Sequence, residues 1–97
     1  MTGEPVTGLG QAFIQAASHA AMKRGALAIW TIYDRPKDHP NGFIARRFEI
    51  GHKVGPLATS DVLTGKLEAL REAFEGAGLV KMARSERDPP HLVESWL

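Results

Sequence analysis

The chain is organised around an uncharged stretch, residues 26–33, with the sequence ALAIWTIY. It is rich in β-branched and aromatic residues, and it lies between Gly25 and the polar segment 34–36. Neither of its two alternating sets of side chains contains a strongly polar group, which is typical of a strand buried on both faces. We therefore predict a central strand with hydrogen-bonded neighbours on both edges and protein on both sides.

A helix is predicted before this strand, over residues 9–24. Its apolar face follows the helical spacing of Leu9, Phe13, Ala16, Ala17 and Ala20. Because alanine lets a neighbouring backbone approach closely, this helix is expected to lie tightly on its own sheet or on a second copy of the chain. Gly25 is well placed to end it. Residues 1–8 are small and turn-prone, and we expect them to be loosely ordered.

A hairpin is predicted after the central strand. Residues 34–42 hold two prolines and an Asn-Gly pair, which indicates a long polar loop. The next strand covers residues 43–50. The side of it that we expect to face the core carries Ile44, Arg46, Phe48 and Ile50. Arg46 then requires either a bulge that turns it outward or a buried acidic partner.

The second predicted helix has the clearest apolar face. It is formed by residues that step by four, three and four positions: Leu63, Leu67, Leu70 and Phe74. Two starts are open: a cap at Ser60 or Asp61, or a cap at Thr64 with residues 61–63 still extended. Glycines at 76 and 78 predict where the helix ends.

The remaining segments complete an α-β-β-α-β-β order. Residues 51–58 are expected to form a loop from their Gly and Pro content, and residues 79–83 and 91–97 are expected to form two strands. The simplest packing for this order is a single α+β domain over residues 1–97. It has a four-stranded, antiparallel-rich sheet with both helices on one face.

Composition narrows the class of protein. The chain has 97 residues, 43% hydrophobic and 24% charged, which is ordinary for a globular domain with one core. A net charge of +1 provides little attraction for nucleic acid or anionic lipid. The absence of cysteine excludes disulfides and thiolate chemistry. With no apolar run of about 20 residues and no signal peptide pattern, we expect a cytoplasmic protein with no membrane partner.

Four short motifs carry a resemblance to known proteins. They are Trp30-x-x-Tyr33-Asp34, Phe43-x-Ala45-Arg46, Leu67-Glu68-Ala69-Leu70-Arg71 and Val93-Glu94-x-Trp96-Leu97. As a set they resemble a family of small uncharacterised proteins, mainly from proteobacteria. The resemblance covers residues 26–97 and leaves the helix at 9–24 outside it. It implies a bacterial cytosolic protein, and it brings no activity, cofactor or catalytic residue with it.

The common catalytic and metal-binding patterns are missing. The four histidines form no H-x-H, H-x-x-x-H or H-E-x-x-H pair, so we predict no metal site. No serine lies in a G-x-S-x-G elbow, and the glycines form neither G-x-G-x-x-G nor a Walker pattern. We therefore predict no cofactor and no catalytic residue, and we favour a protein that is not an enzyme.

One group of residues has the chemistry of a binding site. Its members are Trp30, Asp34, Arg46, Arg47, Glu94 and Trp96. An arginine–carboxylate pair flanked by indole rings can bind a small anionic or planar ligand. The competing hypothesis is structural: Arg46 and Glu94 form an ion pair that specifies strand register, while the tryptophans fill the core.

Taken together, these patterns favour a small non-catalytic binding or assembly domain. Its partner is itself, as a homodimer, or another protein, and the contact surface is expected to include the loop 34–42 and the exposed part of the hairpin. Nucleic acid is the alternative, because Arg46 and Arg47 lie beside aromatic residues on one strand. The less favoured alternatives are a small-ligand binder and an enzyme that uses Asp34, Arg46 and Glu94 as acid–base groups.

Overall fold

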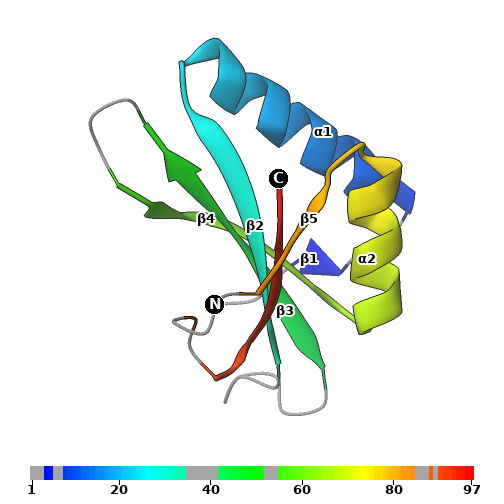
Figure 1. Ribbon diagram of the computed structural model, residues 1–97. Coiled ribbons are helices and arrows are strands. Elements are labelled where there is room, and N and C mark those ends of the chain that lie inside the picture. Colours follow the sequence, from blue (N-terminus) through cyan, green and yellow to red (C-terminus); the bar gives the residue numbers. More distant parts are fainter. Residues whose placement is uncertain (1–3, 6–7, 35–41, 52–54, 85–87, 89) are drawn as a thin grey trace.

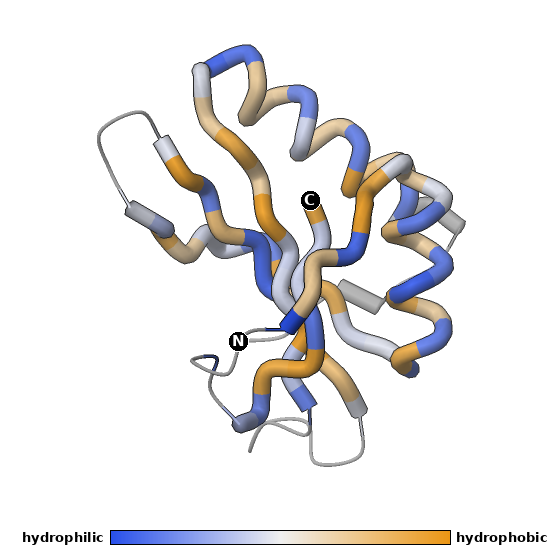
Figure 2. Tube along the Cα trace, in the orientation of Figure 1, coloured by the Kyte–Doolittle hydropathy of each residue, from blue (hydrophilic) through white to orange (hydrophobic). Residues whose placement is uncertain are grey.

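The strand predicted at the centre of the sheet is central in the structure. Residues Leu27–Asp34 form β2, which pairs with antiparallel strands on both edges (Figure 1). Figure 2 shows hydrophobic residues concentrated along it. Trp30, Thr31 and Ile32 in its middle are buried. The prediction of a central strand with neighbours on both edges is therefore confirmed, whereas the helices cover only one of its two sides.

The computed structural model describes residues 4–5, 8–34, 42–51, 55–84, 88 and 90–97. In this part of the chain the elements are β1 (Glu4–Pro5), α1 (Gly8–Lys23), β2, β3 (Phe43–Ile50), β4 (Leu57–Gly65), α2 (Leu67–Gly76), β5 (Lys81–Met82) and β6 (Leu92–Trp96). The strands form one sheet in the order β1-β4-β3-β2-β6-β5. Only β1 runs parallel to its neighbour, and the other pairs are antiparallel.

The α+β class is correct, but the predicted element order and strand number are wrong. The additional long strand is β4, which occupies residues expected to form a loop and the start of a helix. Extended backbone at residues 61–63 was one of the two alternatives, and it is the one observed. Leu63 has the spacing of the helix but lies in β4, where it pairs with Ala45 and joins the core. The helix begins instead after Lys66, whose side chain makes no capping hydrogen bond.

Helix α1 has the predicted extent to within one residue and packs on its own sheet, and its buried face overlaps the predicted face only in part. Of the predicted positions, Ala17 packs against the core and Phe13 contacts Trp30. The buried side chains are Ile14 and Ala21, whereas Ala16 and Ala20 are exposed. The alanine spacing was misleading because Ile14 is the larger apolar side chain and dominates the packing. The end of α1 is as predicted: Gly25 has a φ of 74° and the amide of Ala26 donates to the carbonyl of Ala21.

Both helices cover the same face of the sheet, and the core lies between the helices and the sheet. The core cluster consists of Ile14, Trp30, Ile32, Ala45, Leu63, Leu70, Ala73, Phe74 and Trp96. The aromatic rings form a row in which Phe74 lies between the two tryptophans, with centroids 5.7 Å from Trp30 and 5.8 Å from Trp96. Such tilted pairs stabilise a core beyond the area that they bury.

The side of β3 predicted to face the core is the wrong one. Ala45 is fully buried under the helices, while Ile44, Phe48 and Ile50 are only half-buried on the opposite side. The small Ala45 leaves room for the helices to approach, and the register places it beside Ile32 of β2 and Leu63 of β4. Summed hydrophobicity favoured the other set, but register and helix position decide which side is covered.

The predicted loop surface lies largely outside the described residues, since only Asp34 and Gly42 of the segment 34–42 are described. The same holds for the loose ordering expected at residues 1–8, of which Glu4–Pro5 form β1 and Gly8 begins α1. The shape described below therefore rests on the sheet, the two helices and the segments that directly join them.

Candidate functional site

The six residues proposed for a binding site are divided between the two faces of the sheet. Trp30 pairs in register with Trp96, and Glu94 pairs with Ile32, so these side chains lie on the helix-covered face. Arg46 pairs with Thr31 and lies on the opposite face. The expected ion pair between Arg46 and Glu94 is therefore not formed, because the sheet separates the two side chains.

Glu94 has a different arginine as its partner. Arg71 of α2 reaches down to β6, where its Nη2 lies 2.7 Å from Oε1 of Glu94 and its Nε lies 3.1 Å from Oε2. The indole Nε1 of Trp96 donates to Oε2 at 2.8 Å. Both carboxylate oxygens thus accept charge-assisted or indole hydrogen bonds, which is the condition for keeping a charge buried.

The electrostatics agree with a structural role for this clamp. Burial by itself would raise the pKa of Glu94, but the hydrogen bonds from Arg71 and Trp96 outweigh it and lower that pKa. The pKa of Arg71 is raised, chiefly by its hydrogen bond to Glu94. A carboxylate held ionised in this way is a poor general acid or base at neutral pH. Glu94 therefore lacks the poised protonation that acid–base catalysis requires.

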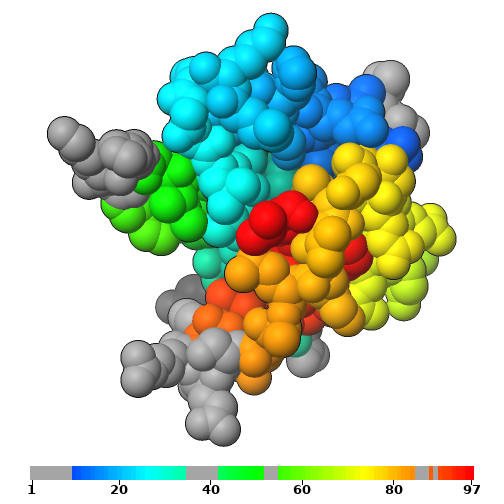
Figure 3. Space-filling model, turned by 45° about the horizontal axis from the view of Figure 1, so that its top comes forward, coloured from blue at the N-terminus to red at the C-terminus, as the bar shows by residue number. Residues whose placement is uncertain are grey.

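A shallow hollow lies beside the clamp. It has a volume of about 510 Å³ and is lined by Arg71, Glu75, Leu79, Val80, Lys81 and Trp96. Figure 3 shows the segments that form it, α2, the residues before β5 and the C-terminal strand, side by side at the surface. Its cations are balanced by carboxylates, since Arg71 is paired with Glu94 and Glu75 also lines the hollow. Trp96 is only 4% exposed, so little indole surface is available to a ligand.

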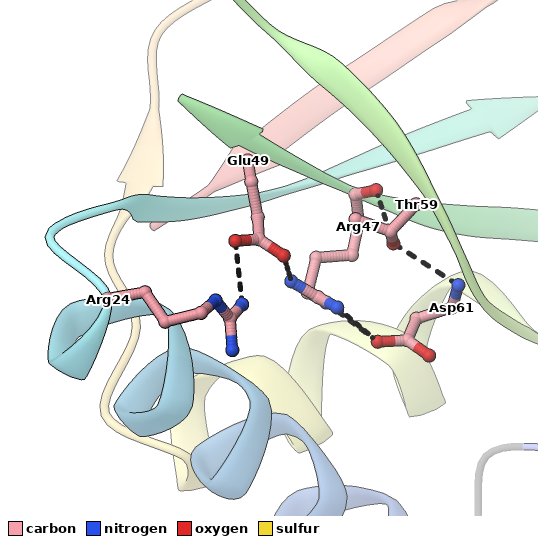
Figure 4. A network of polar contacts seen from close by, with 5 residues as sticks. All are labelled: Arg24, Arg47, Glu49, Thr59 and Asp61. Carbon is pink, nitrogen blue, oxygen red and sulfur yellow. Dashed lines mark hydrogen bonds and ion pairs between the residues drawn. The ribbon is translucent and has the colours of Figure 1, made fainter. Parts of the chain in front are cut away.

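Arg47, the second predicted cation, is also paired. Its Nη1 lies 2.6 Å from Glu49 and its Nη2 lies 2.6 Å from Asp61 (Figure 4). Arg24 at the end of α1 completes the chain of charges by binding the other oxygen of Glu49 at 2.7 Å. Burial would lower the pKa of Arg47, but the hydrogen bonds to Glu49 and Asp61 raise it. This network joins α1, β3 and β4 and is electrically neutral.

A β-bulge accounts for the position of this network. The register between β3 and β4 shifts between Arg46 and Phe48, so the backbone at Arg47 departs from the regular ladder. The hydroxyl of Thr59 donates to the carbonyl of Arg47 at 2.8 Å and accepts from the amide of Asp61 at 3.2 Å. The expected bulge that turns Arg46 outward is not what is observed: Arg46 keeps its pairing with Thr31 and Val62, on the side of β3 that the helices leave uncovered.

The remaining members of the predicted site, Trp30 and Asp34, have structural contacts. Trp30 is fully buried and packs edge-on against Phe13, with centroids 6.2 Å apart. Its indole N–H and the hydroxyl of Ser18 are the two buried side-chain groups without a hydrogen-bond partner in the described part of the chain. Asp34 ends β2, where its backbone amide donates to the carbonyl of His91.

The face of the sheet opposite the helices has a different character, and we call it the open face. It carries Leu27, Ile29, Thr31, Tyr33, Ile44, Arg46, Phe48, Ile50 and Val62, as the strand registers show. None of these residues belongs to the core cluster. Seven of these nine are apolar or aromatic, and the same registers add the polar Thr64 and Ser95 to the face. No described helix lies over it, but Thr31 and Val62 are buried, at 5% and 4% exposed. Arg46 is the only charged residue in the set.

Several classes of site find no support in the described residues. No group of three or more His, Asp or Glu side chains is placed to hold a metal ion among them. Neither described helix has the length and apolar character needed to cross a membrane. Of the four histidines, His19 and His91 are exposed, and the other two lie outside the described residues.

Sequence reasoning missed three participants: Arg71, Asp61 and Val62. Arg71 follows the buried Leu70 and lies outside the apolar spacing of its helix, so the sequence does not show that it pairs with Glu94. Asp61 and Val62 were obscured by the failure to recognise β4. The signal that remained was Val62-Leu63, two adjacent apolar residues that face opposite sides of a strand.

We compared the chain with models of protein families, with curated proteins and with solved structures, and found no match in any of the three. The resemblance based on the four motifs thus stays a prediction, and function has to be argued from the geometry alone.

Proposed function

We propose that this chain is a non-catalytic binding domain whose contact surface is the open face of its sheet. The observation that carries the proposal is a mismatch between sequence and packing. The sequence of β2 suits burial on both sides, yet the helices cover only the side of Trp30 and Ile32. On the other side Ile29 and Tyr33 remain half-exposed, although Thr31 between them is 5% exposed. An apolar area that spans several strands is typical of an interaction surface.

The chemistry of the open face favours a protein partner over nucleic acid. Nucleic acid binding needs several cations that are available to phosphates. Arg47 is 8% exposed and paired with two carboxylates on the other side of the sheet, so it contributes nothing to this face. Arg46 is then left as a single cation among apolar side chains, a composition closer to that of protein interfaces.

The paired state of the other charges also argues for binding without catalysis. The carboxylate of Glu94 is occupied by Arg71 and Trp96, and Arg46 lies on the far side of the sheet. The small-ligand alternative is limited to the hollow beside Trp96, whose charges are balanced. We assign the protein to the bacterial cytoplasm on its cysteine-free composition and on the four motifs.

The first part of the test asks whether the open face belongs to the chain's own core. Phe48→Glu and Ile44→Glu introduce a charge at half-exposed positions outside the core cluster. We expect each to change the free energy of unfolding by less than about 1.5 kcal/mol. Ala45→Glu places a charge under the helices and should abolish folding. Unfolding of the two open-face variants, seen by circular dichroism, would refute a free surface.

The second part asks whether something binds there. The chain has no cysteine, so Ile44→Cys introduces a unique thiol on the open face. Gln15→Cys places a thiol on the exposed side of α1 as the control. We expect maleimide to label Ile44→Cys rapidly in dilute purified protein and more slowly in an extract of the source cells, with Gln15→Cys labelled equally in both. Equal labelling of Ile44→Cys under all conditions would overturn the proposed function.

A further inference from the structure

We infer that the outer edge of β5 is a docking site for an extended segment of another protein, which adds to the sheet as one more strand. The residue of that segment opposite Lys81 carries a neutral apolar side chain that enters the hollow between α2 and β5. The site is separate from the open face, so this inference does not rest on the proposed function.

Strand β5 ends the sheet with one backbone edge unpaired. It comes last in the strand order, and β6 is its only neighbour among the described strands. Val80 and Leu97 exchange both of their backbone hydrogen bonds, at 2.7 and 3.0 Å. In an antiparallel pair the next residue then has its N–H and C=O directed away from the partner strand. That residue is Lys81, and its outward backbone groups lie in a segment, residues 80–84, that is exposed throughout.

The hollow lies on the side of the sheet that Lys81 shares with Trp96. These two residues pair across the ladder, and both line the hollow together with Arg71 and Glu75 of α2. An antiparallel strand added at this edge would pair one of its residues with Lys81, and paired residues have their side chains on the same face. The same added residue therefore supplies two backbone hydrogen bonds to Lys81 and one side chain on the side of the hollow.

The lining of the hollow favours a neutral apolar side chain. Val80 in this lining is 68% exposed, so covering it removes apolar surface from water. The charges are already balanced, because Arg71 is paired with Glu94, and Lys81 and Glu75 have opposite signs. A charged side chain that entered the hollow would lose hydration and leave one charge in excess.

The unpaired edge explains why the occupant is a peptide and not a small molecule. A ligand pocket encloses most of its ligand, and a shallow hollow does not. When a strand is added to a sheet edge, main-chain hydrogen bonds provide the affinity and a pocket for one side chain provides the specificity. The edge of β5 and the hollow beside it supply these two parts together.

The charge of Lys81 disfavours a second copy of this chain as the occupant. A lysine on an edge strand is a common guard against the pairing of like edges. Two copies joined with Lys81 opposite its own counterpart would bring like charges directly together, which destabilises a strand pair. A different chain with a neutral residue at that position avoids this repulsion.

The first experiment uses a capped synthetic peptide of threonines with one central leucine and soluble ends. Binding to the full chain is followed by amide NMR spectra and by hydrogen exchange. We expect the leucine peptide to shift and protect the amide of Lys81, which gains an acceptor. Peptides with a central aspartate or lysine should bind about tenfold more weakly. So should a leucine peptide methylated at its central backbone nitrogen, because it cannot donate to the carbonyl of Lys81. Equal binding of all these peptides, or no protection of Lys81 by the leucine peptide, would overturn the inference.

Two substitutions at one position separate the backbone of Lys81 from its side chain. Lys81→Pro removes the outward N–H and none of the hydrogen bonds to β6, and proline is tolerated at the first residue of an edge strand. It should weaken binding of the leucine peptide by about tenfold or more. Lys81→Gln keeps the N–H and should bind as the parent chain does. Unchanged binding by folded Lys81→Pro contradicts the inference, and if this variant does not fold, the methylated peptide decides.

The same measurements identify the other occupants. If the amide of Lys81 becomes protected without peptide as protein concentration rises, and light scattering shows a doubled mass, the edge pairs with a second copy and the inference fails. If the peptide shifts the signals of Ile29 and Phe48 but not that of Lys81, it binds the open face. That result overturns the edge site while it supports the proposed function.

Discussion

Arg71 and Glu94 are 23 residues apart in sequence, yet their side chains join helix α2 to strand β6 through a two-pronged contact. The Arg71 side chain is 42% exposed, while the Glu94 side chain is 6% exposed. The pair therefore places the buried charge on the sheet and the solvated charge on the helix. This asymmetry determines how each partner should respond to substitution.

Removing Arg71 should cost more than an ordinary surface substitution. Among the described residues, Arg71→Ala leaves the buried carboxylate with the indole of Trp96 as its hydrogen-bond donor. We expect a loss of about 2–3 kcal/mol in the free energy of unfolding, measured by urea denaturation. Glu72→Ala on the exposed side of the same helix is the control and should change it by less than about 0.5 kcal/mol. Equal effects of the two substitutions would show that the clamp contributes nothing.

The stability of the protein should fall in acid. The pKa of Glu49 is lowered by hydrogen bonds from Arg24 and then Arg47, and the pKa of Glu94 is lowered despite its burial. As pH falls, the unfolded chain takes up these protons first, near the ordinary value of 4.5. Stability is therefore full above that pH and is lost as pH falls through the folded values.

The midpoints of urea denaturation, taken from neutral to acid pH, measure this loss of stability. Glu94→Gln should reduce the fall of stability at acid pH, because it removes a group whose folded and unfolded pKa values differ. Arg24→Ala should reduce it through Glu49, and that contribution should be sensitive to salt because Arg24 is 55% exposed. A fall of stability that is unchanged in both variants would contradict the assignment.

Ser18→Ala should stabilise the protein. The hydroxyl of Ser18 is buried without a partner in the described part of the chain, and alanine is the better helix former. We expect a gain of about 0.5–1.5 kcal/mol by thermal or urea unfolding. Gln15→Ala on the exposed side of α1 controls for helix propensity and should gain less than about 0.5 kcal/mol. A net loss for Ser18→Ala would mean that the hydroxyl is satisfied in solution.

Tyr33 reports on the open face directly, because it is the only tyrosine in the chain. Burial raises its pKa above the ordinary 10.0, Arg46 lowers it, and Asp88 raises it. Absorbance titration at alkaline pH should therefore give a higher midpoint for Arg46→Gln and a lower one for Asp88→Asn. Shifts in the opposite directions would refute the placement of these charges around Tyr33. Stability should fall as pH rises above 10.0, since the unfolded chain loses the tyrosine proton first.

Local sequence determined the features that depend on nearby residues. The uncharged stretch at residues 26–33 supplies most of the central strand, and a charge at its positions 28, 30 or 32 would have been buried under the helices. Gly25 and Gly78 mark where the helices end because both adopt a positive φ that other residues resist. These properties depend on a few consecutive residues, so the sequence was sufficient to predict them.

Tertiary structure decided which side of each strand is covered and which charges meet. A strand offers two alternating sets of side chains, and only the register with its neighbours and the position of the helices select one. Ala45 is buried and Ile44 is not for this reason. Likewise Glu94 pairs with Arg71 and not Arg46, because the sheet lies between Arg46 and Glu94 while α2 brings Arg71 over the strand. Long side chains meet through the geometry of the fold, and that geometry is set by contacts far apart in the sequence.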